Sequence, residues 1–234
     1  MLACFSGLGE TVFEPRNPWA HPATPPPIAF LGGIGPVRAR YGPTVETASR
    51  NLPERINRNG VLLRRWLASD AEVLARAVSE SADHLRPWMA WMAEEPQTIE
   101  QRRQLIAGWE REWSHGGDVA LAILVGDEVA GSCGLHRRRG PDALELGYWI
   151  HPRFAGRGIA TKVARLLTDA AFTVPGIQRV EIHHDKANTA SAGVPRRLGF
   201  RFMGEARDER EAPAELGIDC TWRMERERWQ RGAG

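Results

Sequence analysis

The sequence predicts an α/β protein built on one mixed, mostly antiparallel sheet of about seven strands, with helices on both faces. Three strand-like runs follow one another closely at 119–125, 128–135 and 144–150, and Gly126-Asp127 between the first two is typical of a tight hairpin turn. From residue 158 onward, helical and strand-like patterns alternate, which predicts crossover connections within the same sheet.

The first regular segment is a predicted strand at 61–66, and two helices follow it. Asp70 suits the N-cap of a helix that ends near residue 79, because its side chain can accept hydrogen bonds from the free amides of the first turn. Thr98 opens a second helix that runs to about residue 113, and Gly116-Gly117 ends it.

After the three strands, the pattern predicts a helix at 158–172, a strand at 179–183, a helix that ends near Gly199, and two closing strands at 200–206 and 220–225. Proline is unfavourable inside a helix because it lacks an amide hydrogen and clashes with the preceding turn. We therefore expect the last helix to begin near Ser191, which places Pro195 in or just beyond its first turn.

The chain divides into two regions of different composition. Residues 1–55 are rich in proline and show no helical or strand period, so we expect a poorly ordered N-terminal arm. Residues 56–234 carry the regular patterns and form the predicted domain. The arm is either a passive tail or a segment that packs on the domain or on a partner, and both interpretations remain open.

Composition narrows the partners and the location. A net charge of +2 gives no reason to expect nucleic acid. No apolar run approaches the ~18 residues that span a bilayer, and no signal-peptide pattern begins the chain, so we expect a cytoplasmic protein without a membrane partner. Cys4, Cys133 and Cys220 are too scattered for a disulfide framework or a zinc motif, and we expect no metal. We expect a monomer or a homodimer.

The segment from 144 to 161 carries the clearest signal for ligand binding. An apolar strand leads through His151 into a turn of the form Arg153-x-x-Gly156-x-Gly158, and a helix follows. Glycines let a backbone approach a ligand closely, and the free amides and dipole of a helix N-terminus favour an anion. These features predict a pyrophosphate cradle with Arg153 and Arg157 at its rim. The Ile-Ala-Thr after the last glycine excludes the dinucleotide fingerprint and the P-loop.

A second block begins with Asn188 and Ser191 and ends with Leu198-Gly199-Phe200. Together with the strand-turn-helix block, it resembles the cofactor signatures of the GNAT N-acetyltransferase superfamily. The segments 84–89 and 222–224 are similar to the branch that acetylates N-terminal amines of ribosomal proteins, the RimJ/RimL type. The resemblance covers residues 60–229 and implies a single GNAT-like domain whose sheet is splayed at the cofactor site.

The resemblance implies direct transfer of acetyl from acetyl-CoA, used as a co-substrate, to an amine. The strand that ends near residue 150 would splay from its neighbour at residue 179 onward, and its backbone would bind the pantetheine arm. Backbone amides from residue 153 to residue 160 would hold the pyrophosphate, and Asn188 would contact the arm near its thiol. The expected cofactor-binding residues are Trp149, Ile150, His151, Arg153, Gly156, Arg157, Gly158, Ile159, Ala160 and Asn188.

We expect Glu145 to act as the general base, directly or through a water. Strand alternation places it on one face with Gly147 and Trp149, and it is the only charge in an apolar run. If the side chain is half-buried, its pKa should rise toward a useful range for a base. The alternative is a structural carboxylate paired with an arginine on a neighbouring strand, and both interpretations remain open.

We expect Ser191 to act as the general acid toward the departing sulfur. Many members of the superfamily use a tyrosine, but this chain has only Tyr41 and Tyr148, and neither lies in the helix that ends near Gly199. The alternatives are a serine that only starts the helix, or a water. Cys133 is expected to be a small buried side chain rather than a nucleophile, and His183 and His184 should face opposite ways, which argues against a shared metal.

The predicted acceptor is the N-terminal α-amine of a protein. A small amine, such as an antibiotic or a polyamine, is the alternative acceptor, and a non-catalytic acetyl-CoA-binding module is the alternative class. Two features bear on the acceptor site without deciding it. Tryptophans could line a groove or form core, and the acidic stretch at 205–215 could attract a cationic amine or be a solvated loop. The tryptophans are Trp88, Trp91, Trp109 and Trp113.

Overall fold

The computed structural model describes residues 52–232. The predicted N-terminal arm lies outside these residues except for its last four, and it remains a prediction. Leu52 is buried against the main core, and Arg55 begins the first strand, β1 (Arg55–Arg58). Residues 52–55 therefore belong to the folded region.

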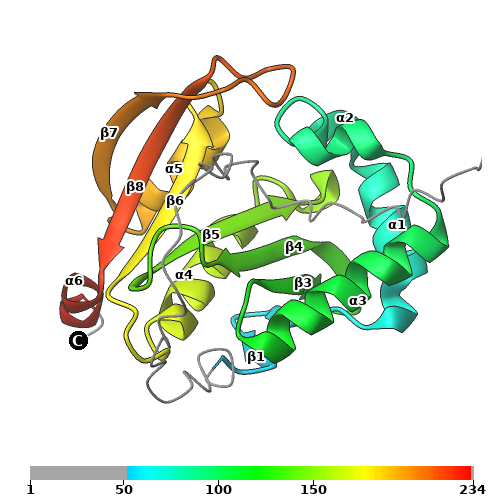
Figure 1. Cartoon of the computed structure of the whole chain (residues 1–234), viewed down its shortest axis with the longest axis horizontal. Helices are drawn as coiled ribbons and strands as arrows, with labels where there is room; N and C mark the ends of the chain where they lie inside the picture. The colour runs from blue at the N-terminus through cyan, green and yellow to red at the C-terminus, as the bar shows by residue number, and fades with distance from the viewer. Residues whose placement is uncertain (1–51, 233–234) are drawn as a thin grey trace, which may run out of the picture.

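One sheet of eight strands forms the centre of the fold, in the order β1-β2-β3-β4-β5-β6-β8-β7 (Figure 1). Every neighbouring pair is antiparallel except β5 and β6, which are parallel. The mixed, mostly antiparallel sheet is thus confirmed, with one strand more than predicted. The other strands are β2 (Val61–Arg65), β3 (Val119–Val125), β4 (Glu128–His136), β5 (Ala143–Ile150), β6 (Arg179–Asp185), β7 (Arg201–Arg207) and β8 (Ile218–Glu225).

The strand missed by the sequence analysis is β1, which forms a hairpin with β2. Asn59 and Gly60 connect the two strands, with positive φ angles of 55° and 75°. Two such residues form a type I′ turn, whose twist matches that of the strands it joins. The Asn-Gly pair is itself a hairpin signal, but the polar segment before it has no apolar alternation to mark a strand.

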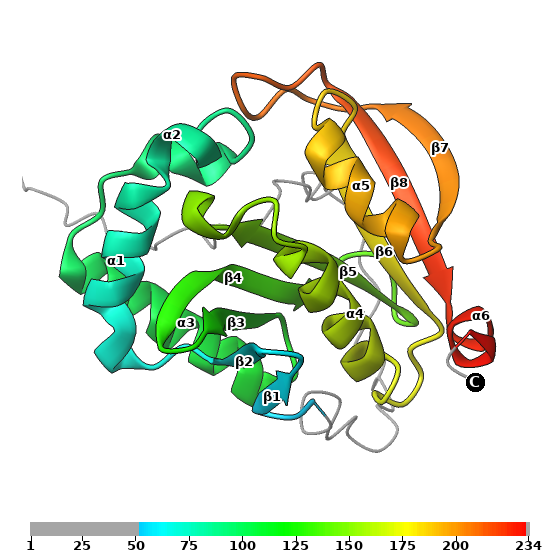
Figure 2. The same cartoon turned by 180° about the vertical axis from the view of Figure 1, so that it is seen from behind.

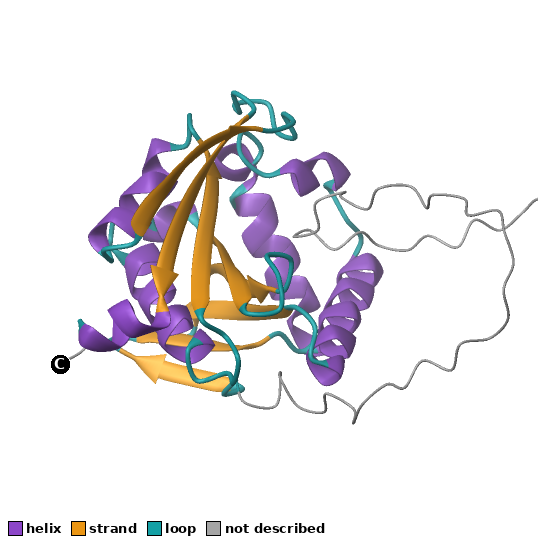
Figure 3. Ribbon diagram, turned by 60° about the vertical axis from the view of Figure 1, so that its left-hand side comes forward, coloured by secondary structure: helices purple, strands orange, loops and turns teal. Residues whose placement is uncertain are grey.

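Helices cover both faces of the sheet, as predicted (Figure 3). Asp70 and Thr98 occupy the expected N-cap positions, but only Thr98 caps with its side chain, which accepts the Gln101 amide at 3.2 Å. The Asp70 carboxylate makes no capping bond to the helix that follows it and pairs with Arg64 instead. One face carries α1 (Ala71–Glu80) and α3 (Ile99–His115), and the other carries α4 (Ile159–Ala171) and α5 (Thr189–Arg197). The shorter elements are η2 (Ala68–Asp70), α2 (Ala82–Leu85), η3 (Ala90–Glu94), η4 (Pro152–Phe154) and α6 (Arg226–Arg231).

Two hydrophobic clusters, one on each face, hold the helices to the sheet. The larger includes Val163 of α4 with Leu146 of β5 and Val180 of β6, and the smaller includes Leu74 of α1. Cys133 is fully buried in the larger cluster, and burial raises the pKa of its thiol. Cys133 is therefore a small apolar side chain, as expected, and not an exposed thiolate.

A β-bulge in β4 brings this strand close to the end of β5. The pairing shifts from Ile123–Gly131 to Leu124–Val129, so Ala130 is the extra residue. Gly131 has a φ of 149°, and a Cβ there would lie 2.1 Å from the Trp149 carbonyl oxygen. The Ala130 carbonyl accepts the His151 amide at 2.8 Å. The bulge thus fixes the point where the ligand-binding segment begins.

Gly131→Ala should lower the free energy of unfolding by about 2 kcal/mol, because the added Cβ must displace the Trp149 carbonyl. Gly126→Ala is the matched control in the adjoining turn. Its φ is also positive, at 61°, but a Cβ there meets nothing within 4 Å, so we expect a loss of about 1 kcal/mol. Urea unfolding of both variants measures the difference, and equal losses would contradict the close approach of β4 to β5.

Candidate active site

The parallel ladder between β5 and β6 ends after three residue pairs, the last of which is Glu145–Glu181. Both strands continue without pairing to each other, β5 to Ile150 and β6 to Asp185. Figures 1 and 2 show the two strands diverging from this end. The side of residues 146–150 that faces β6 thus has backbone groups that no described strand pairs. The predicted splay is present, and it begins after residue 181 rather than at residue 179.

The chain leaves β5 through a turn that opens α4. His151 caps η4 by accepting the Arg153 amide at 3.2 Å. Gly156 and Gly158 both have a φ of 73°, and a Cβ built at either meets nothing within 4 Å. Gly158 is the N-cap of α4, whose first turn has neither a side-chain cap nor an acidic residue. The amides of this turn are therefore available to an anion.

Two arginines lie at the rim of this turn, as predicted, but their surroundings differ. Arg153 pairs with Glu128 and also lies over the Phe154 ring, 5.8 Å from its centroid. Arg157 also lies over the Phe154 ring, 5.6 Å from its centroid, and it has no carboxylate partner among the described contacts. Arg153 is thus partly neutralised, whereas Arg157 keeps its charge for a ligand.

These features fit a pyrophosphate attached to a long amide-containing arm. The glycine turn and the uncapped start of α4 suit the phosphates. The backbone groups of residues 146–150 that face away from β4 offer amides and carbonyls to the arm. The predicted cofactor-binding residues from 149 to 160 all lie on this strand, turn and first helical turn, and Asn188 lies at the start of α5.

Helix α5 begins earlier than predicted. Asn188 is its N-cap and accepts the Ser191 amide at 3.1 Å, so the helix starts at Thr189 and not near Ser191. Pro195 therefore lies inside the helix, which corrects the expected position in or just beyond the first turn. In a regular helix the amide of residue 195 would donate to the carbonyl of Ser191, and proline has no such amide.

Tyr148 reaches from β5 to the carbonyl that Pro195 leaves without a helical donor. Its hydroxyl donates to the Ser191 carbonyl at 3.5 Å and lies 3.3 Å from the Ser191 hydroxyl oxygen. Burial raises the pKa of Tyr148 to about 12, against the opposing effects of Ser191 and of the Arg197 charge, so the hydroxyl stays protonated. The sequence analysis did not place Tyr148 here. Pro195, four residues after Ser191, was the sequence signal that the Ser191 carbonyl has no helical amide donor.

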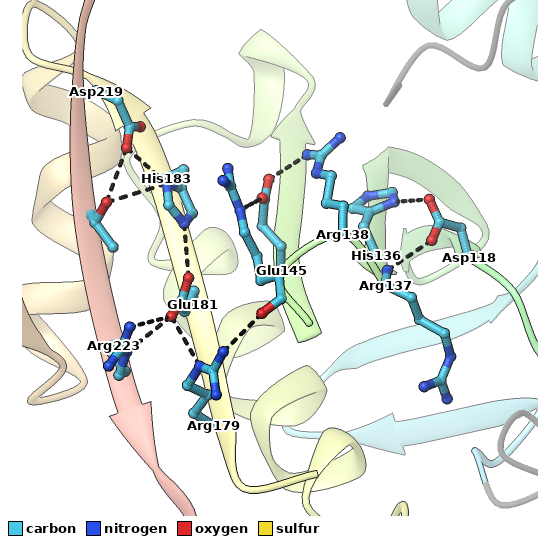
Figure 4. A network of polar contacts seen from close by, with 12 residues as sticks. Asp118, His136, Arg137, Arg138, Glu145, Arg179, Glu181, His183, Asp219 and Arg223 are labelled. Carbon is cyan, nitrogen blue, oxygen red and sulfur yellow. Dashed lines mark hydrogen bonds and ion pairs between the residues drawn. The ribbon is translucent and has the colours of Figure 1, made fainter. Parts of the chain in front are cut away.

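Glu145 is bound by two arginines of the segment after β4, Arg138 and Arg139. Figure 4 shows Arg138 beside the Glu145 carboxylate. Its carboxylate is buried, with 4% of the residue exposed. Burial alone raises its pKa, but the hydrogen bonds and charges of the arginines outweigh burial and hold the pKa at about 2. The expected rise in pKa is therefore wrong, because it considered burial without these ion pairs. The contacts match the alternative of a structural carboxylate.

A second buried carboxylate, Glu181, lies opposite Glu145 on the last paired rung of the ladder. Arg179 and Arg223 both form ion pairs with Glu181, the latter at 2.8 Å (Figure 4). Two carboxylates on adjacent strands would repel each other without these cations. The arginines therefore stabilise the point from which β5 and β6 separate.

His183 and His184 face opposite ways, as predicted. The ring nitrogens of His183 lie 3.2 Å from Glu181 and 2.9 Å from Asp219 (Figure 4). Burial lowers the pKa of His183, but the hydrogen bond with Asp219 and the charges of Glu145 and Asp219 outweigh burial and raise the pKa above its ordinary value. His184 Nε2 instead accepts the Trp222 indole hydrogen at 3.0 Å. Neither imidazole therefore presents an unoccupied basic nitrogen.

The four tryptophans do not form one groove. Trp91 and Trp109 line a pocket between α1, α3 and the sheet, and Trp109 belongs to the smaller core cluster. Trp113 instead lies under the Arg65 guanidinium, 4.9 Å away. The acidic stretch lies partly in the β7–β8 loop, where the Ala214 amide donates to the carbonyl of Pro87, just after α2, at 2.9 Å. This bond ties the loop to the segment before η3.

Two negative observations apply to residues 52–232. No helix in this part of the chain is both long and apolar enough to cross a bilayer. Within the same range, no group of histidine, cysteine and acidic side chains is arranged to hold a metal ion.

A splayed strand pair beside an anion-binding turn at the start of a helix is the arrangement expected of an acetyl-CoA-binding fold. The family model described as "Acetyltransferase (GNAT) domain" matches residues 61–201. The chain belongs to the GNAT acetyltransferase family. It is an N-acetyltransferase, and acetyl-CoA is its acetyl donor.

Similar proteins include two curated enzymes and many solved structures. The chain is 31% identical over 150 residues to YdaF of Bacillus subtilis (strain 168), provisionally named a ribosomal N-acetyltransferase. The aligned stretch covers 63% of this chain and 81% of YdaF. It is 35% identical over 75 residues to the spermidine N(1)-acetyltransferase of Escherichia coli (strain K12), which covers 32% and 38% of the two chains. The solved structure of RimL, a ribosomal L7/L12 α-N-protein acetyltransferase with coenzyme A, has the same fold, with a TM-score of 0.66, 22% identity and coverage of 74% and 97%.

Proposed function

We propose that the acceptor is the N-terminal α-amine of a protein, with ribosomal proteins as the preferred class. The names of YdaF and of RimL support this choice, since both refer to ribosomal acceptors. A cytoplasmic location and a monomer or homodimer are part of the same proposal. The observation that carries the proposal is that Arg138 and Arg139 both bind the Glu145 carboxylate, which leaves Glu145 poorly suited to remove a proton.

The amine must be neutral before it can attack a thioester. An α-amine has an ordinary pKa of about 7.7–8.0, whereas a lysine-like alkyl amine has one of about 10.4. Near pH 8, roughly half of an α-amine is already neutral, but less than about 1% of an alkyl amine is. Glu145 has a pKa of about 2, which is too low for efficient proton removal at neutral pH, and both ring nitrogens of His183 are engaged by Asp219 and Glu181. An α-amine is the acceptor that least needs a strong base.

Ser191 and Tyr148 are the proposed groups on the sulfur side. Bound acetyl-CoA supplies an acetyl group activated as a thioester. In this proposal Ser191 Oγ donates a proton to the sulfur as the carbon–sulfur bond breaks, and it regains a proton from solvent, directly or by way of the Tyr148 hydroxyl. The amine's second proton passes to water. Glu145 as general base stays a prediction that its ion pairs do not favour.

A small-amine acetyltransferase is the second candidate. The similarity to the spermidine enzyme favours it, over a shorter stretch of the chain. Thiol release from acetyl-CoA, measured against N-terminal peptides, polyamines and aminoglycosides, separates the candidates. We expect release with Ser- or Ala-starting peptides. Release only with small amines would contradict the proposal, and cofactor binding without release from any acceptor would favour a non-catalytic module.

The pH dependence should report the acceptor and not the protein. For a Ser-starting peptide, kcat/KM should rise with pH along a limb whose apparent pKa is near 8, because the reactive form is the neutral α-amine. An acceptor peptide with a less basic α-amine should move that limb downward by the same amount. Initial rates from pH 5.5 to 9.5 test this expectation. A limb that stays at one pH for both acceptors would instead indicate a base within the protein.

A further inference from the structure

Arg197, the last residue of α5, docks on the beginning of α4. Its Nε donates to Oγ1 of Thr161, the third residue of α4, at 3.1 Å. Its side chain also turns back along α5, because a Cβ built at Gly193 would lie 3.0 Å from Nη1 and 3.3 Å from Nη2. The guanidinium is therefore held between the two helices, beside the first turn of α4.

This exposed position favours an anion, because two positive features meet there. A helix N-terminus carries roughly half a positive charge, which stabilises anions and repels cations. The first turn of α4 contains no acidic residue, and the described polar contact of Arg197 is the neutral Thr161 hydroxyl. Two positive features thus lie side by side without a negative group between them.

Two other basic side chains near the turn are already engaged, whereas Arg157 keeps its charge for a ligand. Arg153 pairs with Glu128, and Lys162 donates to the Asn59 carbonyl at 3.3 Å. The charge of Arg197 also acts on the Tyr148 hydroxyl, opposing the rise of its pKa. The Arg197 charge therefore influences Tyr148, at the splay between β5 and β6, and the guanidinium also contacts the start of α4.

We infer that Arg197 binds a phosphate of acetyl-CoA and closes the cradle from the α5 side, across from the glycine turn. A guanidinium suits this role because it holds phosphate oxygens through paired N–H donors. The glycine at 193 leaves the space in which the guanidinium lies. The pyrophosphate and the 3′-phosphate of acetyl-CoA both present the anionic oxygens that such a contact needs. The inference rests on the use of acetyl-CoA, and not on the identity of the acceptor.

The test compares the binding of three ligands in the absence of any acceptor. Dissociation constants for coenzyme A and 3′-dephospho-coenzyme A are measured by calorimetry, and that for pantetheine by ligand-observed NMR. Arg197→Gln should weaken coenzyme A binding about tenfold or more, because a charged hydrogen bond is lost, and should leave pantetheine binding within twofold. A loss that persists with the dephospho ligand assigns Arg197 to the pyrophosphate, and a loss that disappears assigns it to the 3′-phosphate.

Arg196→Gln is the matched control. Arg196 is the neighbouring exposed arginine of α5, and it lies over the Trp222 ring at 5.5 Å. This variant should leave all three constants within twofold. The inference is overturned if Arg197→Gln binds coenzyme A as tightly as the wild type, or if it weakens pantetheine as much as coenzyme A. The proposed function fails separately, if the wild-type protein binds coenzyme A but acetylates no α-amine.

Discussion

Replacing Ser191 with alanine is expected to lower kcat for acetyl transfer about 100-fold, with a change in KM for acetyl-CoA of less than about threefold. The variant removes the α5 hydroxyl that lies 3.3 Å from the Tyr148 hydroxyl. A proton donor acts as the sulfur leaves, so its loss should affect turnover more than binding. Tyr148→Phe should cost about tenfold in kcat, because it removes a group that acts through Ser191.

The double variant tests whether the two hydroxyls form one unit. If they do, the loss in kcat should be no larger than that of Ser191→Ala alone, because coupled groups are not additive. Thr189→Ala, at the exposed first residue of α5, is the control and should retain full kcat. Full activity in Ser191→Ala would instead mean that the serine only helps to start the helix and that a water protonates the sulfur.

Glu145→Gln should lower the free energy of unfolding by about 3 kcal/mol at pH 7 and reduce kcat by less than about threefold. The folded pKa is about 2, against an ordinary value of 4.5, and each unit is worth about 1.4 kcal/mol. A depressed carboxylate pKa stabilises the fold above pH 4.5, and that stability is lost as the pH falls toward 2. The difference between wild type and variant should therefore shrink over this range.

Urea unfolding at several pH values gives the stability, and steady-state kinetics at pH 8 gives the turnover. Glu227→Gln is the control, because Glu227 forms an exposed pair with Arg231 at 3.8 Å and should contribute less than about 0.5 kcal/mol. A 100-fold loss of kcat in Glu145→Gln with unchanged stability would restore Glu145 as the general base and contradict the structural role.

The strand, turn and helix of the ligand-binding segment could be predicted because their signals are local. A glycine at 158 signals the start of α4, because glycine readily adopts the left-handed conformation found there, and Thr98 signals α3 by its capping box. The parallel pairing of β5 with β6 followed from the crossover through α4. Strand β1 was missed because its polar sequence has no apolar alternation, although the Asn59-Gly60 turn beside it does carry a signal.

The chemistry of the site was harder to predict because it depends on contacts between distant segments. The strand pattern places Glu145 in an apolar run, but it does not show that Arg138 and Arg139 turn back onto it. Tyr148 and Ser191 lie 43 residues apart, and their contact requires both the splay and the continuation of α5 through Pro195. The register of a strand fixes the face on which a side chain lies, but not its partner.

The position of the acetyl group on a peptide product tests the central claim most directly. The substrate is a Ser-starting peptide with a free α-amine and one internal lysine, incubated with acetyl-CoA near pH 8, where roughly half of the α-amine but less than about 1% of the lysine amine is neutral. Tandem mass spectrometry of the product should place a single acetyl group on the α-amine. Acetylation of the lysine, or an unmodified peptide under conditions in which spermidine is acetylated, would contradict the account.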